Sequence, residues 1–372
     1  MFIIDILVFL IVLGIVVLVH EFGHFIAAKT SGVKVEEFGV GFPPKLWKKK
    51  IGETEYFFGA IPFGGMTKIF GMDEMDEEKE KNSRGYESKS AWKKLWICGG
   101  GVIMNLLFAA LVFYALIGST GFKSEQALIY SDYHFPFGNQ VNQVLIAQVE
   151  ENSPAATTGL KPYDVVLSVN GEMVNGSDEF SSVIAENKGK EVTLGLKDGR
   201  EVQITPRAET TANQGPLGVG LRDMAVLNYS SIPEKALVGF LHAYNITDYS
   251  IRAMGYIFSY AIINKSMETV AYSMTGPVGI FAITKIIIQR GFYDLVNLIA
   301  ILSIALGISN LLPIPAMDGA KLIYIGLQAS NKKIFSKDLQ IKIESFGAIF
   351  LILLAVVIIL KDFIQFKDII FK

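Results

Sequence analysis

One short motif inside an apolar run constrains this chain more than any other feature. Residues 17–28 read Val-Leu-Val-His-Glu-Phe-Gly-His-Phe-Ile-Ala-Ala, and the segment before them is almost entirely hydrocarbon apart from Asp5. In a helix, His20 and His24 lie on one face, so both imidazoles can bind one metal ion, and Glu21 stands beside them as a general base. The sequence therefore predicts a zinc site within a membrane-spanning helix.

A signal peptide or a plain membrane anchor is the competing interpretation of the same segment. A signal peptide has a basic start and a small-residue cleavage site, but the first lysine here is Lys29 and no such site precedes His20. Two histidines and a glutamate are also costly in an apolar helix unless they serve a purpose. A metal site therefore explains the motif better than chance does.

Composition indicates a membrane protein with an inserted soluble region. Hydrophobic residues make up 51% of the 372 residues, and the mean hydropathy is +0.39, although the middle third is ordinary. The single cysteine, Cys98, excludes an intrachain disulfide and a cysteine-based structural zinc site. A bilayer of about 30 Å needs roughly 20 apolar residues per helix. The segments that meet this condition are Phe2–Ala28, Ile97–Ile117, about Tyr293–Pro313 and about Phe346–Leu360.

The charges of the loops predict the orientation. Residues 29–95 carry 13 Lys and Arg, clustered at residues 45–50 and again at Lys93 and Lys94, so this loop should be cytoplasmic. Residues 121–290 carry 13 basic against 17 acidic side chains and should lie outside. Both termini are then expected outside as well.

The basic loop contains two aromatic segments with many glycines and prolines, at residues 38–47 and 53–65. Their alternation predicts short strands joined by turns. Two placements stay open. The strands could lie at membrane depth, where irregular backbone is tolerated only against protein or water, or they could form a hairpin on the membrane surface.

The soluble insertion reads as short strands from residue 139 to 207. Turn signals at Asn170-Gly171 and Asp198-Gly199 separate them, and a helix is expected over Phe180–Asn187. The predicted strands are Val144–Val149, Val165–Val169, Val192–Leu196 and Glu201–Thr205. The segment resembles a PDZ domain of the bacterial periplasmic type, through the runs Asn152–Ala156, Gly159-Leu160, Asp164–Val166 and Val169–Gly171. Residues 229–274 mix aromatics with few charges, which predicts helices along the outer membrane surface.

A third metal ligand is needed, because a catalytic zinc site uses three protein groups plus water. The third predicted span ends in Asn310-Leu-Leu-Pro-Ile-Pro-Ala-Met-Asp-Gly319. Asp318 follows two prolines that interrupt the helix, so it is the best candidate to join His20 and His24. The alternative is that Asp318-Gly319 is only a turn.

The second predicted span opens with Gly99-Gly100-Gly101 and contains Asn105. Glycines let helix backbones approach closely, and a buried amide needs a partner. Asn105 is therefore expected either to join helices or to take part in the site.

With both halves considered, the chain resembles the site-2 proteases, in particular the bacterial RseP/RasP type of intramembrane zinc metalloprotease with one PDZ domain. The resemblance rests on His20–His24, Pro62–Gly65, Gly101–Asn105, the PDZ-like segment and residues 310–319. It implies a polytopic α-helical membrane protein with about four transmembrane helices, a membrane-associated β-hairpin and one inserted extracytoplasmic PDZ domain of α+β type.

The resemblance also implies a division of the chain into four parts. Residues 1–120 would form the first half of the protease core and residues 121–215 the PDZ domain. Residues 216–290 would be a membrane-surface helical linker, and residues 291–372 the second half of the core. The expected location is the bacterial cytoplasmic (inner) membrane.

For the site, the resemblance implies Zn²⁺ held by His20, His24 and Asp318, with Glu21 as the base. Asn310 is expected to contact the substrate or the transition state. The hairpin, about Glu53–Lys68, is expected to pair with an unwound substrate. The expected substrate-binding residues are Gly64, Gly65, Asn105 and Pro313.

Expected partners are the lipid bilayer and pre-trimmed single-span membrane proteins, such as anti-sigma factors or signal-peptide remnants, and no nucleic acid. Two rival functions are weighed. A catalytically inactive scaffold acting through its PDZ domain would normally have lost Glu21 or a ligand. A metal transporter would need further intramembrane acids or histidines, and the remaining spans supply almost none.

Overall fold

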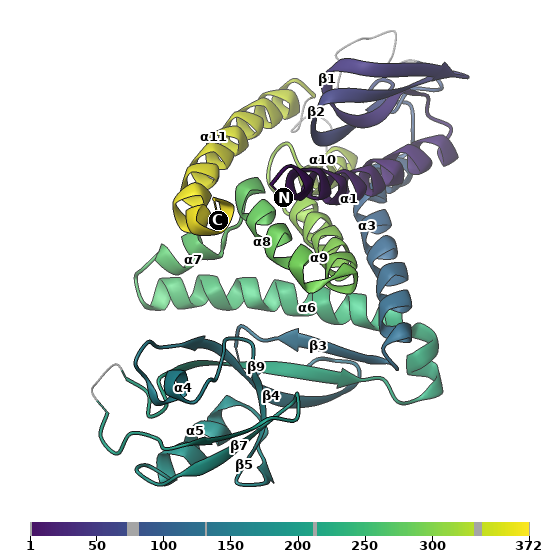
Figure 1. Ribbon diagram of the computed structural model, residues 1–372. Helices are drawn as coiled ribbons and strands as arrows, with labels where there is room; N and C mark the ends of the chain where they lie inside the picture. The colour runs from purple at the N-terminus through teal and green to yellow at the C-terminus, as the bar shows by residue number, and fades with distance from the viewer. Residues whose placement is uncertain (1, 73–81, 131, 211–213, 331–336, 372) are drawn as a thin grey trace. The chain divides into compact units, whose positions relative to one another are not determined.

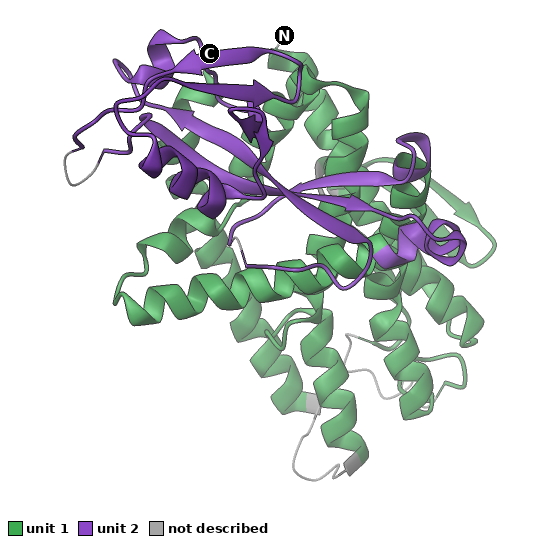
Figure 2. Cartoon of the chain, turned by 90° about the horizontal axis from the view of Figure 1, so that it is seen from below, with its two compact units in different colours: residues 1–116, 242–372 green, residues 117–241 purple. Residues whose placement is uncertain are grey.

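A computed structural model describes residues 2–72, 82–130, 132–210, 214–330 and 337–371. The chain divides into two compact units (Figure 2). The first unit contains residues 1–116 and 242–372, and the second contains residues 117–241.

Helices dominate the first unit (Figure 1). The described helices are α1 (Phe2–Thr30), α3 (Ala91–Ser119), α6 (Ile232–Ile263), α7 (Glu268–Ser273), α8 (Pro277–Arg290), α9 (Phe292–Leu311), α10 (Asp318–Ser330) and α11 (Lys337–Ile370). The end of α3 and the start of α6 belong to the second unit. Among the described residues, α1, α3, α9 and residues 338–370 of α11 are long and apolar enough to cross a membrane. These helices correspond to the four predicted spans. α9 ends at Leu311, two residues before the predicted end of the third span, and α11 is much longer than the fourth. Only 6% of the most apolar stretch of α11 is buried inside the protein, as expected for a helix that faces lipid.

The small sheet of the first unit consists of β1 (Val35–Ile51) and β2 (Thr54–Ile69). Both strands bend, so residues 37–40 of β1 pair with residues 55–58 of β2 on one side and with residues 65–68 on the other. The second half of β1 pairs with the first half of β2, as at Trp47 and Phe58. The sheet therefore has residues 65–69 as one edge and residues 45–51 as the other. Two long bent strands replace the several short ones that were predicted.

Helices α1 and α3 cross with almost no side chain between them. A Cβ atom added at Gly100 would lie 2.7 Å from the carbonyl oxygen of Gly23, and one added at Gly23 would overlap the carbonyl of Gly100. Such glycine contacts let two apolar helices approach backbone to backbone. This approach holds the histidines of α1 against α3.

Charged side chains connect α8 and α11. The fully buried carboxylate of Asp362 accepts hydrogen bonds from the amides of Gly276 (2.9 Å) and Gly279 (2.8 Å) at the start of α8. In return, Lys285 Nζ donates to the carbonyl oxygens of Ile369 (2.9 Å) and Ile370 (3.2 Å) at the end of α11. Each helix thus supplies the charge that the other's terminus favours.

The second unit is built on a sheet of seven strands in the order β3-β9-β4-β5-β7-β8, with β6 paired to β5. The strands are β3 (Lys123–Ala127), β4 (Asn139–Val149), β5 (Val165–Val169), β6 (Glu172–Met173), β7 (Val192–Leu196), β8 (Glu201–Ile204) and β9 (Val219–Asn228). Two helices accompany them, α4 (Pro154–Thr157) and α5 (Ser177–Glu186). Alternate strand residues such as Ile146, Leu194 and Ile204 form the core with Phe180 of α5.

The four strands predicted for this region correspond to β4, β5, β7 and β8, and the predicted helix corresponds to α5. The structure differs from the prediction after residue 215. Residues 219–228 form strand β9, which pairs with β3 and β4, so this part of the predicted helical linker is a strand of the sheet. After it, α6 is one helix of 32 residues.

Candidate metal and active site

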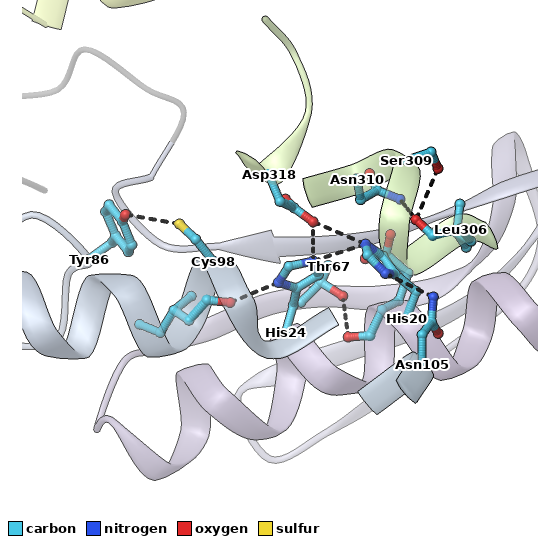
Figure 3. A network of polar contacts seen from close by, with 12 residues as sticks. His20, His24, Thr67, Tyr86, Cys98, Asn105, Leu306, Ser309, Asn310 and Asp318 are labelled. Carbon is cyan, nitrogen blue, oxygen red and sulfur yellow. Dashed lines mark hydrogen bonds and ion pairs between the residues drawn. The ribbon is translucent and has the colours of Figure 1, made fainter. Parts of the chain in front are cut away.

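Three ligand-type atoms from the first unit meet at one point (Figure 3). His20 Nε2 lies 3.2 Å from His24 Nε2, and Asp318 Oδ2 lies 3.1 Å from each of them. The two histidines come from α1, and Asp318 opens α10, after the chain has turned back from the end of α9. The structure thus brings the three predicted ligands together.

The spacing of these atoms suits a zinc ion. Tetrahedral bonds of about 2.0–2.1 Å place neighbouring ligand atoms about 3.3–3.4 Å apart, close to the observed triangle. Two imidazoles and a carboxylate are also a donor set that zinc accepts, and three protein donors leave one position for water. The residues present therefore fit the metal.

His24 is held in the orientation that a metal ligand needs. Its Nδ1–H donates to the carbonyl oxygen of Ile97 on α3 at 2.8 Å, and this fixes the lone pair on Nε2, the atom that faces His20 and Asp318. The ring is buried, with 8% of the residue exposed. The partner is a backbone carbonyl, so no residue type at position 97 could have indicated it.

His20 is held in a similar way by Asn105. The amide of Asn105 lies 3.3 Å from His20 Nδ1, and its own Oδ1 is buried with no hydrogen-bond partner. The two ends of an amide exchange by a half-turn, and turning Oδ1 toward His20 lets it accept the Nδ1–H. In that orientation Nε2 of His20 keeps its lone pair toward the metal position.

Asp318 is ionised in this environment. Burial of the side chain opposes the charge, but the adjacent imidazoles of His20 and His24 outweigh it and hold the pKa of that carboxyl well below its usual range. The position of Asp318 in the first turn of α10 also favours a negative charge. An anionic oxygen is therefore available to a cation.

Gly101 leaves the space that the two rings occupy. A Cβ atom at this position would lie 2.5 Å from His24 Nε2 and 2.7 Å from His20 Nε2. At Gly99, by contrast, the nearest atom to an added Cβ is 3.9 Å away. Sequence reasoning assigned the three glycines only to helix packing and missed this contact with the site.

A cavity of about 380 Å³ opens beside the three ligand atoms. Glu21 lies in its wall, and β2 lies across from it, tied to α1 by a hydrogen bond from Thr67 Oγ1 to the carbonyl of Glu21 (3.0 Å). A Cβ atom at Gly65 would lie 2.6 Å from Glu21 Cγ, so the glycine lets the strand edge approach the carboxylate. The cavity thus holds a candidate base and a backbone edge beside the metal position.

The other predicted site residues divide into two groups. Gly64, Gly65 and Asn310 line the cavity, and the Asn310 amide donates to the carbonyl of Leu306 in its own helix at 2.9 Å. Asn105 is fully buried behind His20, and Pro313 also lies outside the cavity wall. The substrate contacts predicted for these last two residues stay predictions.

Comparison with known proteins places the chain in a family. The family model for Peptidase family M50 matches residues 8–354. The chain belongs to peptidase family M50. The predicted membership of the site-2 protease family is therefore confirmed.

Several bacterial relatives match over nearly their whole length. A "Putative zinc metalloprotease" of Clostridium acetobutylicum is 30% identical over 96% of this chain and 97% of its own. The "Regulator of sigma-W protease RasP" of Bacillus subtilis is 25% identical and the "Probable protease eep" of Enterococcus faecalis 28%, each over 97% of this chain and 99% of its own.

Proposed function

We propose that this protein is an intramembrane zinc metalloprotease that cleaves membrane-spanning segments of other proteins. The observation that carries the proposal is the triangle of His20, His24 and Asp318, assembled in a bundle of apolar helices with Glu21 in the adjoining cavity wall. Membership of a peptidase family and relatives named as zinc metalloproteases support the same reaction and the same metal.

His20, His24 and Asp318 would hold the ion. Bound zinc would supply a water with a pKa near about 7 and would polarise a peptide carbonyl. Glu21 would accept the proton of the attacking water and return it to the departing amine. Within the described part of the chain no partner holds the Glu21 carboxylate, so it can take this role.

The edge of β2 is the proposed docking strand. Residues 65–69 pair with β1 on one side, and no strand among the described residues pairs with their other edge. A helical substrate hides its carbonyls in hydrogen bonds to the residue four positions on, so it must unwind before cleavage. An unwound segment added to this edge would have its backbone satisfied while one carbonyl faces the metal.

The proposed orientation puts the basic loop in the cytoplasm and the second unit outside. Cysteines introduced at Ser83 and Ser177 test it with a thiol reagent that does not cross membranes. We expect Ser177→Cys to be labelled in cells with an intact inner membrane and Ser83→Cys only after permeabilisation. The reverse pattern would invert the topology.

We further propose that the second unit is an extracytoplasmic PDZ domain that excludes substrates until their outer parts have been trimmed. Its sheet with α5 and the PDZ-like sequence runs support the fold. The relative RasP is named as a regulator of sigma-W, and this supports a regulatory substrate of the anti-sigma-factor type. Signal-peptide remnants have the same single-span form. Recruitment through a bound C-terminal carboxylate is the opposing role.

The two roles predict opposite results when the unit is removed. The amide of Tyr229 donates to the carbonyl of Phe122 (3.0 Å), so a short Gly-Ser linker can replace residues 123–228 without moving the ends. A gate predicts that this variant cuts an untrimmed substrate, and recruitment predicts slower cutting of the trimmed one. Unchanged rejection of the untrimmed substrate by a zinc-loaded variant would count against the gate.

Glu21→Gln tests the proposed reaction itself. Cleavage of a model transmembrane substrate should fall at least 100-fold, on the order expected for loss of a general base, while zinc stays near one per chain. Substantial turnover by this variant would exclude Glu21 as the base. No cleavage by the wild-type protein, with zinc bound, would favour the inactive scaffold.

A further inference from the structure

Two adjoining cavities lie at the other end of α1, between α1, α8 and α11 of the first unit. The first, of about 420 Å³, has an apolar wall that includes Phe9, Leu10 and Phe281. The second, of about 630 Å³, is lined by polar as well as apolar side chains. Phe2, Ile370 and Phe371 line both cavities, so an apolar chamber and a more polar one share part of their walls.

The polar chamber contains a carboxylate that the protein itself does not satisfy. Asp5 is only 4% exposed, yet its Oδ2 is buried without a hydrogen bond, and no side chain in the described residues forms an ion pair with it. Asp368, in the same wall, is an exposed acid that also has no partner among these residues. Buried polar atoms in proteins nearly always have a partner, so the chamber lacks a donor that something else must supply.

Among the described residues that line the polar chamber, Lys285 is the one that carries a positive charge. Two of the three protons on its ammonium point to the carbonyl oxygens of Ile369 and Ile370, which leaves one for another acceptor. The wall therefore presents two carboxylates and one ammonium donor beside an apolar chamber. A head group with an ammonium and a phosphate, joined to a hydrocarbon chain, complements all three features.

We propose that these cavities bind a phospholipid with a primary-amine head group, of the phosphatidylethanolamine class. Its ammonium donates to Asp5 and Asp368, its phosphate accepts from Lys285, and part of one acyl chain fills the apolar chamber. A choline head group has no N–H to offer Asp5, and a glycerol head group leaves the lipid anionic beside two carboxylates. Asp5 lies 15 residues before His20, about 22 Å along the helix, so the site is separate from the metal position.

The test uses the full-length protein, stripped of lipid in detergent and titrated with phosphatidylethanolamine, phosphatidylcholine or phosphatidylglycerol of identical acyl chains. Native mass spectrometry counts the bound lipid, and thermal unfolding records stabilisation. We expect phosphatidylethanolamine to bind at least about fivefold more tightly than either other lipid, and to raise the unfolding temperature more.

Asp5→Asn keeps the shape of the side chain and removes its charge, so the preference for the amine lipid should fall to less than about twofold. Asp294→Asn is the matched control, because Asp294 is a half-buried acid in the first turn of α9 and lines neither chamber. This control should keep the wild-type preference.

Val278→Trp should fill the apolar chamber and weaken binding of all three lipids alike. If this variant does not fold, Asp5→Asn still decides the question. Equal binding of the three lipids by the wild type, or an unchanged preference in Asp5→Asn, would overturn the proposal. Tighter binding of phosphatidylglycerol would overturn it as well, because Lys285 alone would then select the head group.

Discussion

The two ends of α1 treat buried polar side chains in opposite ways. Near its C-terminal end, His20 and His24 each have partners on both ring nitrogens, from α1, α3 and α10. Near its start, the carboxylate of Asp5 is just as buried but has no partner in the described residues. A polar side chain in an apolar helix indicates a site in both cases. At the C-terminal end the protein itself supplies the hydrogen-bond partners of the side chains. At the start it does not, so another molecule must supply the partner of Asp5.

The largest effect is expected from a substitution at the metal-binding end of α1 that leaves all three proposed ligands unchanged. Gly101→Ala would put a Cβ atom between the two imidazoles, so we expect zinc content and cleavage both to fall to about a tenth or less. Zinc is measured by atomic emission on the purified protein. Gly99→Ala adds the same methyl group two residues earlier, where there is room, and should keep both properties. Full zinc in Gly101→Ala would show that α1 and α3 are not held as closely as described.

Asn105 tests the orientation of His20. Replacing it with Leu removes the acceptor for His20 Nδ1–H, so zinc affinity should fall about 10–100-fold, the usual cost of a lost partner behind a metal ligand. Competition with a zinc chelator measures this affinity. Asn105→Asp keeps an acceptor oxygen and should retain most of the affinity. A loss in Asn105→Asp as large as in Asn105→Leu would mean that the amide acts through its NH₂ group.

Asp362 has the backbone partners that Asp5 lacks, because its Oδ2 accepts from two amides at the start of α8. Asp362→Asn weakens the acceptor for the amides of Gly276 and Gly279, so it should destabilise the protein by about 1–3 kcal/mol in mixed micelles with SDS. Asp338→Asn, at the exposed start of the same helix, removes only a surface pair with Lys342 and should change stability by less than about 0.5 kcal/mol. Equal effects would mean that the buried carboxylate does not hold α8 to α11.

Asp5→Asn should have the smallest effect, and of the opposite sign. In lipid-free micelles it removes an unpaired buried carboxylate, so stability should stay constant or rise by about 0–1 kcal/mol. The same SDS unfolding measurement applies. If Asp5→Asn lowered the free energy of unfolding as much as Asp362→Asn, Asp5 would have a partner within the protein. The two ends of α1 would then not differ in this respect.

The sequence predicted those features of the structure that follow from hydrophobic periodicity or from the chemistry of single residue types. The four apolar helices follow from long hydrophobic runs, and the meeting of His20, His24 and Asp318 follows from the ligand count of a zinc site. The carbonyl of Ile97 and the space at Gly101 could not be predicted, because they depend on how closely α3 crosses α1. Strand β3, Lys-Ser-Glu-Gln-Ala, carries almost no apolar signal, since its place at the sheet edge requires little burial.

The separation of the ligands along the chain also matters while the protein is being made. Asp318 follows His20 by 298 residues and His24 by 294. At about 5–20 residues per second, a ribosome needs about 15–60 s to travel from one half of the site to the other. During that interval the nascent chain in the membrane has only two of the three groups. With the proposed set of three ligands, the protein can acquire its activity only after residue 318 has been synthesised, so shorter nascent chains cannot attack the membrane proteins inserted beside them.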